Sequence, residues 1–346
     1  MKLSRCSIRV AALLAAPLAL VVAPFVLASQ AHAAELTLPR DGWASWEVPA
    51  VEEAPAWCCW TWKGNKIDEL RKPCRLDRDS DGFGSRNQET TDAVRVYARM
   101  ASGKVDRLHV FAAACPVQAA TPITDLGDVV ADDSARWLTD LAKHARGEPD
   151  EHHDIGEKAL AALAIHRGKL AGDALAAMAR SDASDETRKQ AVFWLAQVRG
   201  AEGAQITSFV MFNDEDPDVR EHAAFSLSQS EAPRVAAELI RLGNTDQDDN
   251  VRAQAWFWLA QTGAAEAEAA IVAALKKDTD DNVREQAIFA LSQLPDERAT
   301  QALIAAAEDR SLAREERKRA IFWLSQAHTD AAQEYLSKVL AGGATD

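Results

Sequence analysis

The second half of the sequence repeats itself at a nearly constant interval. Ten-residue phrases begin at an arginine every 32 residues, with a final step of 33, and a typical one reads Arg-Ala-Gln-Ala-Trp-Phe-Trp-Leu-Ala-Gln. The phrases begin at Arg188, Arg220, Arg252, Arg284 and Arg317. Because one such short unit cannot bury its apolar face alone, the interval predicts an array of similar units, each packed on its neighbours.

Each unit is predicted to be a pair of antiparallel helices. The phrases carry apolar residues at helical spacing, and acidic turns such as residues 214–218 supply N-caps before them. An eroded copy at Ala159, Ala161 and Leu163 is typical of a terminal capping unit. The predicted second helices are Gly203–Asn213, Val235–Leu242, Ala264–Lys277 and Ala299–Asp309.

The phrases resemble the HEAT repeat, in particular the phycobilisome-lyase-like type. The resemblance rests on Asp-Pro-Asp-Val-Arg at 216–220 and Asp-Asp-Asn-Val-Arg at 248–252 and 280–284, with Ala three residues and Leu seven residues beyond each Arg. It implies a mainly α fold, an αα-superhelix (a HEAT/armadillo-like solenoid) of about six helix pairs over residues 130–341. It also implies that Arg220 stacks with Asp248, and Arg252 with Asp280, between neighbouring repeats. The Gly that usually follows the Leu is replaced here by Ala or Ser and then Gln.

Residues 1–33 have the features of a secretory signal peptide. Lys2, Arg5 and Arg9 precede an apolar run from Ala11 to Ala28, and Ala31-His32-Ala33 fits a signal-peptidase site. An uncleaved membrane anchor is the alternative, but the small residues at the end of the run favour cleavage. We therefore predict a periplasmic or secreted protein, with no membrane insertion after cleavage. The chain as a whole also resembles a group of exported bacterial HEAT-repeat proteins with a cysteine-containing N-terminal segment.

Residues 34–128 are predicted to form a small Trp/Cys-rich domain of β or irregular structure. Alternation from Val94 to Met100, a turn at Ser102-Gly103 and a returning run from Val105 to Ala113 predict a β-hairpin. The tryptophans near its start are interpreted as core, with a carbohydrate-stacking platform as the alternative. Cys58, Cys59, Cys74 and Cys115 predict two disulfides in an oxidising compartment, in which Cys58 and Cys59 each pair with Cys74 or Cys115. The sequence leaves open which of the two possible pairings forms.

The repeated phrase places an unusual stripe opposite its apolar seam. At 100° per residue, Val219, Ala223 and Leu227 share one arc of the helix, whereas Phe225 and Gln229 fall on the other side. If these helices line the concave side, the stripes form a ladder of rings and amides that binds a protein or peptide. Packing between neighbouring repeats is the alternative. The predicted partner-binding residues are Gln190, Phe193, Gln197, His222, Phe225, Gln229, Gln254, Phe257, Gln261, Gln286, Phe289, Gln293, Phe322 and Gln326, with Arg319 in the place of a Gln.

Two further segments contain residues that could bind a metal ion, but neither is predicted to do so. Asp77, Asp79 and Asp81 with Gly82 match the first half of a calcium loop, but Gln88 stands where the last ligand is expected, so a solvated acidic turn is the favoured interpretation. His152-His153 lies in a polar turn, and we predict no metal there. The net charge of −14 disfavours nucleic acid as a partner.

An enzyme is not predicted. Deoxyhypusine hydroxylase, a HEAT-repeat enzyme, takes its iron ligands from His-Glu pairs, and this sequence has no His-Glu dipeptide. There is also no Gly-x-Ser-x-Gly, His-Glu-x-x-His or phosphate loop. We expect no cofactor and a non-enzymatic binding scaffold. An enzyme or sensor module centred on the N-terminal cysteines and the calcium-like segment is the alternative.

Overall fold

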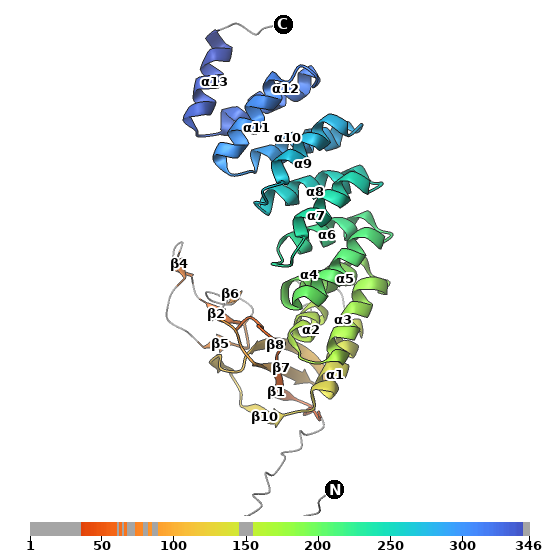
Figure 1. The fold of residues 1–346 in the computed structure, drawn as a ribbon. Coiled ribbons are helices and arrows are strands. Elements are labelled where there is room, and N and C mark those ends of the chain that lie inside the picture. The colour runs from red at the N-terminus through yellow and green to blue at the C-terminus, as the bar shows by residue number, and fades with distance from the viewer. Residues whose placement is uncertain are drawn as a thin grey trace, which may run out of the picture. The chain divides into compact units, whose positions relative to one another are not determined.

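A computed structural model of the chain describes residues 36–60, 62–63, 66–67, 73–78, 82–84, 89–144 and 155–341. The predicted signal peptide, Asp79, Asp81 and His152-His153 lie outside these residues. From Ala33 onwards the chain forms one compact unit, with strands first and helices after them (Figure 1).

The N-terminal part is a small β domain, as predicted. Its main sheet has four strands in the order β10-β1-β7-β8, in which β1 is antiparallel to β7 and parallel to β10. The strands of this sheet are β1 (Gly42–Pro49), β7 (Ala93–Ala101), β8 (Lys104–Ala112) and β10 (Ile123–Asp128). Among the described residues, short strands form three further pairs: β2 (Cys58–Trp60) with β6 (Gly82–Gly84), β3 (Trp62–Lys63) with β4 (Lys66–Ile67), and β5 (Cys74–Arg75) with β9 (Val117–Gln118).

The predicted hairpin is confirmed as β7 and β8. Ala101 pairs with Lys104, so Ser102 and Gly103 form a two-residue loop, and both have a positive φ, of 53° and 79°. Two positive φ angles are those of a type I′ turn, whose twist matches that of the two strands it joins.

The sheet and the first helices share one hydrophobic core. Trp46 and Trp57 are buried in this core, and Trp43 is buried in a second, smaller cluster around the cysteines, which confirms the core interpretation for these three tryptophans. The indole Nε1 of Trp46 donates to Ser134 Oγ at 2.8 Å, and Ser134 Oγ lies 2.8 Å from His166 Nε2. Because His166 Nδ1 also lies 2.6 Å from the carbonyl oxygen of Ala162, it carries the ring proton, and Nε2 accepts from Ser134. This buried chain of hydrogen bonds joins β1 to the helices α1 (Ala131–His144) and α2 (Ile155–Ile165).

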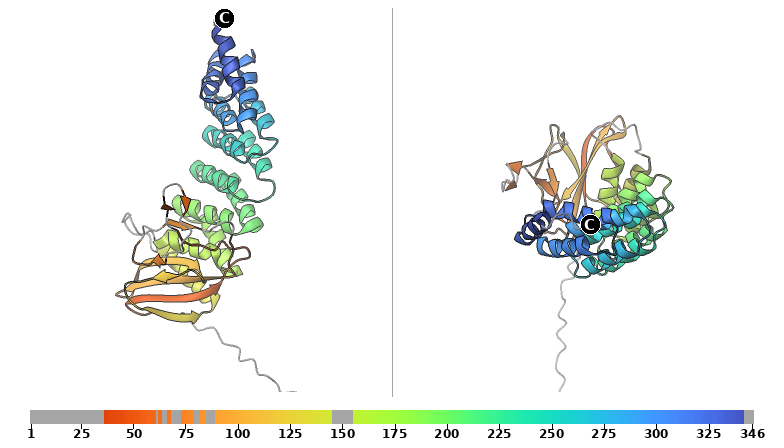
Figure 2. Two further views of the ribbon diagram at one scale, coloured as in Figure 1. Left: turned by 90° about the vertical axis from the view of Figure 1, so that its left-hand side faces the viewer. Right: turned by 90° about the horizontal axis from the view of Figure 1, so that it is seen from above.

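The remainder is an array of helix pairs stacked in chain order (Figure 2). The helices with the repeated phrase, here called the phrase helices, are α4 (Asp185–Val198), α6 (Pro217–Ser228), α8 (Asp249–Gln261), α10 (Asp281–Ser292) and α12 (Arg314–Gln326). The intervening helices are α3 (Lys169–Ser181), α5 (Gly200–Asn213), α7 (Val235–Thr245), α9 (Ala267–Lys277), α11 (Asp296–Glu308) and α13 (Asp330–Ala341). With α1 and α2 these make six pairs followed by α13, as the repeat interval predicted.

Three of the phrase arginines, Arg188, Arg220 and Arg252, each connect their own helix to the ends of the intervening helices before and after it. Arg220 donates through Nε and Nη2 to both carboxylate oxygens of Asp246, at 2.9 Å each, and through Nη1 to the carbonyl of Asp214 at 3.0 Å. The pattern recurs as Arg188 with Asp214 and Arg252 with Asp278. Asp214, Asp246 and Asp278 are 32 residues apart, but the next position, 310, is an arginine. Arg284 pairs with Glu316 instead.

The pairs implied by the HEAT resemblance, Arg220 with Asp248 and Arg252 with Asp280, are therefore wrong. The true partners lie two residues earlier in the chain. Asp248 and Asp280 are N-caps, whose side chains accept from the first backbone N–H groups of α8 and α10. Asp248 and Asp280 thus cap helices, whereas Asp246 and Asp278 accept from the arginines.

Candidate functional site

The phenylalanines of the predicted stripe come together in one row. Those of α4 to α10 are half-buried, and Phe322 on α12 is 55% exposed. Within each phrase helix the opposite side is buried, as at Val219, Ala223 and Leu227. The phrase helices also pack more closely on one another than the intervening helices do, which is what a concave side requires.

Tryptophans extend this row into a continuous aromatic ladder. Its rings are, in order, Trp57, Trp194, Phe193, Phe225, Trp258, Phe257, Phe289, Trp323 and Phe322, with each centroid within 6.2 Å of the next. The ladder starts on the β domain, because Trp57 meets Trp194 at 5.3 Å. At its other end Phe322 contacts Trp323 of its own helix, and among the described residues it makes no ring contact with the next helix. The ladder is thus closed by the β domain at one end and open at the other.

Two kinds of contact alternate along the ladder. Phe193 stacks on Phe225, and Phe257 on Phe289, with interplanar angles of 12° and 7°. Between these stacks a tryptophan reaches back one repeat, so that Trp258 meets Phe225 at 50° and Trp323 meets Phe289 at 41°.

These tryptophans were not predicted as part of the stripe, although the phrases contain a signal for them. The residue after each Phe is alternately large and small: Trp194, Ser226, Trp258, Ala290, Trp323. Where it is small, two phenylalanines stack directly, and where it is Trp, the indole lies against the preceding Phe.

The glutamines lie beside the ladder in two groups. Gln190, Gln254 and Gln286 at the start of each phrase are half-buried, and Gln190 donates to Glu186 at 3.1 Å. At the end of the phrase Gln293 is half-buried, whereas the other amides are exposed, namely Gln197, Gln229, Gln261 and Gln326. Gln261 donates to Gln293 across the repeat boundary at 3.5 Å. The stripe thus combines packing between repeats with exposed amides beside partly exposed rings.

His222 takes the place of a glutamine on α6. Burial lowers the pKa of His222, so the ring is neutral at physiological pH. Its Nε2 is buried without a hydrogen-bond partner among the described residues.

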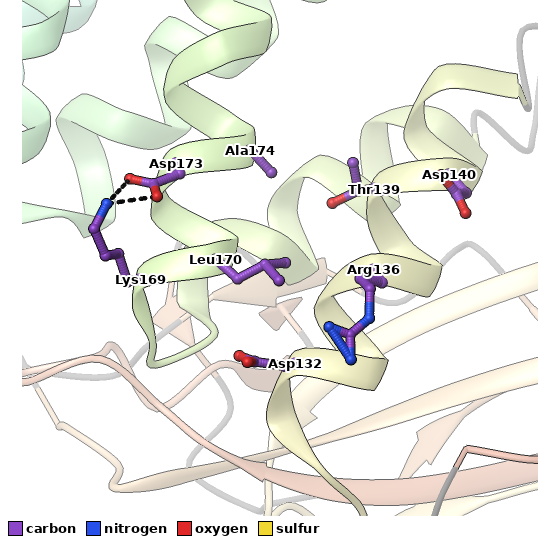
Figure 3. Close-up of a pocket in the computed structure, with 8 residues that line it drawn as sticks. All are labelled: Asp132, Arg136, Thr139, Asp140, Lys169, Leu170, Asp173 and Ala174. Carbon is purple, nitrogen blue, oxygen red and sulfur yellow. Dashed lines mark hydrogen bonds and ion pairs between the residues drawn. The ribbon is translucent and has the colours of Figure 1, made fainter.

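Two of the surface hollows formed by described residues lie away from the ladder. One, of about 790 Å³, lies between α1 and α3 and has exposed charged residues on its walls, where Lys169 pairs with Asp173 at 2.6 Å (Figure 3). The other, of about 680 Å³, lies between α5 and α7, where the guanidinium of Arg241 is 4.1 Å from the centroid of Phe212. Phe209 beside it is 51% exposed. Both hollows are open, and the charged groups in the first are exposed, with Lys169 and Asp173 paired with each other. The ladder is therefore the better candidate for a binding site.

The four cysteines of the β domain form two disulfides, as predicted. Cys58 pairs with Cys115 and Cys59 with Cys74, which decides between the two pairings left open by the sequence. The sulfurs of Cys58, Cys74 and Cys115 are the only group of His, Cys, Asp and Glu ligand atoms that converge within the described residues. Because thiolates and not disulfides bind metals, this group is not a metal site in the oxidised protein.

Asp77, the first residue of the calcium-like loop, has several partners. Its carboxylate accepts from the indole of Trp43 at 3.2 Å and from the backbone N–H of Ala120 at 2.5 Å, and it faces Arg99 at 3.5 Å. These contacts lower the pKa of Asp77 below its ordinary value, although burial opposes them. Asp79 and Asp81 lie outside the described residues, so the acidic turn stays the favoured interpretation and calcium the weaker alternative.

Comparison with known proteins identifies the repeats. Residues 172–256 and 243–325 match the family model of HEAT repeats. The helical array contains HEAT repeats. Its similarity to the phycobilisome-lyase-like type and to exported proteins stays a prediction, and a comparison with curated proteins gave no match.

Two solved structures are similar to part of this HEAT-repeat chain. Human deoxyhypusine hydroxylase in complex with glycerol is 16% identical, over 60% of this chain and 90% of that one, with a TM-score of 0.28. A computationally designed self-assembling cyclic homo-oligomer is 19% identical, over 62% and 73%, with a TM-score of 0.14. Such low TM-scores support no statement about function. Among the described helices, none has the length and apolarity needed to cross a membrane.

Proposed function

We propose that this protein is a non-enzymatic scaffold that binds a protein or peptide partner along the aromatic ladder. HEAT arrays present extended surfaces on which a partner segment can lie. The observation that carries the proposal is the pairing of partly exposed rings with a row of exposed amides, at Gln197, Gln229, Gln261 and Gln326. Amides bond to an extended backbone whatever its sequence, while the ring edges take up apolar side chains.

We also propose that the scaffold works in the cell envelope, in the periplasm or outside the cell. Two buried disulfides persist in an oxidising compartment and are rare in the cytosol. The N-terminal sequence of the protein recovered from an envelope fraction tests this proposal. We expect the chain to begin at Ala34, whereas an intact Met1 in a cytosolic fraction would contradict it.

Peptide selection on the purified protein tests the binding role. Random twelve-residue peptides are displayed, and the enriched ones are measured by calorimetry against the protein and its variants. We expect Phe322→Ser to weaken binding about tenfold or more, because truncating an aromatic hot-spot residue typically costs about 2 kcal/mol or more. Removing the exposed amides, as in Gln261→Ala, is expected to weaken binding less.

The chain offers a matched control for Phe322. Phe209 on α5 is similarly exposed but lies on an intervening helix, away from the ladder. Phe209→Ser therefore removes the same chemistry from another surface, and we expect it to leave binding unchanged. Equal effects of the two substitutions, or the absence of any enriched peptide, would contradict the proposal.

A further inference from the structure

The ladder face carries a different charge at its two ends. On α6, Asp218 and Glu221 precede Phe225 by seven and four residues, so both lie on the same side of the helix as the ring. Glu221 is half-buried and has no hydrogen bond or ion pair among the described residues. Burial, followed by the negative charges of Asp218 and Asp248, raises the pKa of Glu221. On α4, Glu186 and Lys189 hold the corresponding positions before Phe193, and Lys189 also interacts with Asp218. With three carboxylates and one ammonium group beside Phe193 and Phe225, this end of the face has a net negative charge.

The open end is basic in an otherwise acidic protein. Lys318 and Arg319 precede Phe322 by four and three residues, and both are about half exposed. Glu315 and Glu285 pair with them, but Arg314 at the start of α12 is exposed and has no ion-pair partner among the described residues. The other acidic residue of this helix, Glu316, is taken up by Arg284. An excess of positive charge therefore surrounds the exposed ring of Phe322.

The middle of the face has little charge. On α8 the residue four before Phe257 is Ala253, and Asn250, Gln254 and Gln261 occupy the remaining positions of the stripe. The rings from Phe225 to Phe322 follow one another at 4.7 to 5.6 Å. An extended peptide covers that path with about eight residues, at roughly 3.3 Å each.

We infer that the ladder face binds an extended peptide segment of opposite charge polarity, with a basic end at α6, an apolar and uncharged middle, and an acidic end at α12. This inference rests on the proposed function. Complementary charges at the two ends fix which end of the segment lies where, while the uncharged middle leaves its sequence free. The basic end of the segment then lies towards the β domain, which closes the ladder beyond α4. Its acidic end lies at the open end, beside Phe322.

Three synthetic twelve-residue peptides test the polarity. One has two Lys at one end and two Glu at the other, with a neutral middle containing Phe. The second has the same composition with Lys and Glu alternating, and the third replaces all charges by Gln. We expect the bipolar peptide to bind about tenfold tighter than either, and to lose this advantage in 0.5 M salt because such charges are screened.

A photo-reactive residue beside the Lys end locates that end. We expect cross-links to α4 and α6, and with the residue beside the Glu end, cross-links to α12. Glu221→Gln and Glu221→Lys are expected to remove the advantage of the bipolar peptide without changing the binding of the neutral one. Glu297→Lys, an equal charge change on the exposed surface of α11, is the control and is expected to change neither.

The outcomes separate the two proposals. Equal affinity for all three peptides, or cross-links from the Lys end to α12, would overturn the polarity and leave the binding role intact. Failure of all three peptides to bind at millimolar concentration would count against the binding role itself.

Discussion

Arg220 holds Asp246, 26 residues further along the chain, through two hydrogen bonds to its carboxylate, and leaves Asp248 to cap α8. The two aspartates, although almost adjacent, therefore contribute to stability in different ways. The side chains of Arg220 and Asp246 are only 13% and 6% exposed, so the pair is largely shielded from water.

The two aspartates are expected to differ in what their loss costs. Asp246→Ala leaves a shielded guanidinium without its partner, and we expect the free energy of unfolding to fall by about 3 kcal/mol. Asp248→Ala removes an N-cap and should cost about 1 kcal/mol. Urea unfolding of the two variants measures both values. A larger loss for Asp248→Ala would show that the cap, and not the ion pair, joins the repeats.

Phe257 and Phe322 occupy the same position in their phrases but differ in packing. Phe257 lies between Trp258 and Phe289, so we expect Phe257→Ser to cost about 2–3 kcal/mol, below the cost for a fully buried ring. Phe322→Ser should cost less than about 1 kcal/mol, because the ring is mostly exposed. Thermal melting of both variants provides the comparison. A large loss of stability for Phe322→Ser would mean that Phe322 belongs to the core. The substitution could then not be used to test binding.

The buried histidine between sheet and helices predicts a loss of stability in acid. Burial lowers the pKa of His166 to about 4 from the ordinary 6.5. Above pH 6.5 the ring is neutral in both states, but between 6.5 and 4 only the unfolded chain takes up the proton. The free energy of unfolding should therefore fall by about 1.4 kcal/mol for each pH unit in this window.

The control is His166→Gln, which keeps one donor and one acceptor but has no proton to gain. We expect the variant to be less stable at pH 7 and to lose stability less steeply from pH 6.5 to 4, as followed by urea unfolding. Carboxylates elsewhere in the chain change the stability of both proteins equally. If the free energies of unfolding of the two proteins fall in parallel with pH, protonation of His166 is not the cause.

Gly243 on α7 touches the ring of Trp256 on α8. A Cβ at residue 243 would lie 2.5 Å from ring atom Cε2 and 2.6 Å from Cζ2. Gly243→Ala is therefore expected to destabilise the array by about 1–3 kcal/mol, although alanine favours a helix over glycine. In Gly243→Ala combined with Trp256→Phe, the smaller ring relieves the clash, so the two losses should not add. Additive losses in a double-mutant cycle would disprove the contact.

The two disulfides close loops of different length, with sequence separations of 57 for Cys58–Cys115 and 15 for Cys59–Cys74. On loop entropy alone, replacing both cysteines of the longer loop by Ser should cost about 4 kcal/mol, and of the shorter about 3 kcal/mol. Peptide mapping without reduction checks the pairing first. Peptides that join Cys58 to Cys74 would contradict the structure.

Much of the fold could be predicted from the sequence, because it depends on local patterns. The interval between phrases and the spacing of apolar residues determined the helix pairs, and Ser102-Gly103 marked the hairpin. The disulfide pairing could not be predicted, because neighbouring cysteines have nearly the same position along the chain and differ only in the direction of their side chains. The shared core of sheet and helices was also hidden, since Trp46, Ser134 and His166 meet only after folding.

The candidate site was predicted in part. Helical spacing placed Phe225 and Gln229 on one side, but it could not reveal that Trp258 reaches back to the preceding repeat. The arginine partner was assigned two residues too late, because an aspartate that caps a helix and one that pairs with arginine look alike in a sequence. Contacts between repeats depend on how helices are offset, and a single repeat does not specify this offset.

The alternation of large and small residues after each ladder phenylalanine has a consequence for how this array can grow or shrink. Deleting α5 and α6 would bring two tryptophan-bearing phrases together, and an indole would enter the place where two phenylalanines now stack. Deleting two consecutive repeats would preserve the order of contacts at the new junction. The unit of duplication, for evolution as for an engineer who wishes to lengthen the array, is the pair of repeats and not the single one.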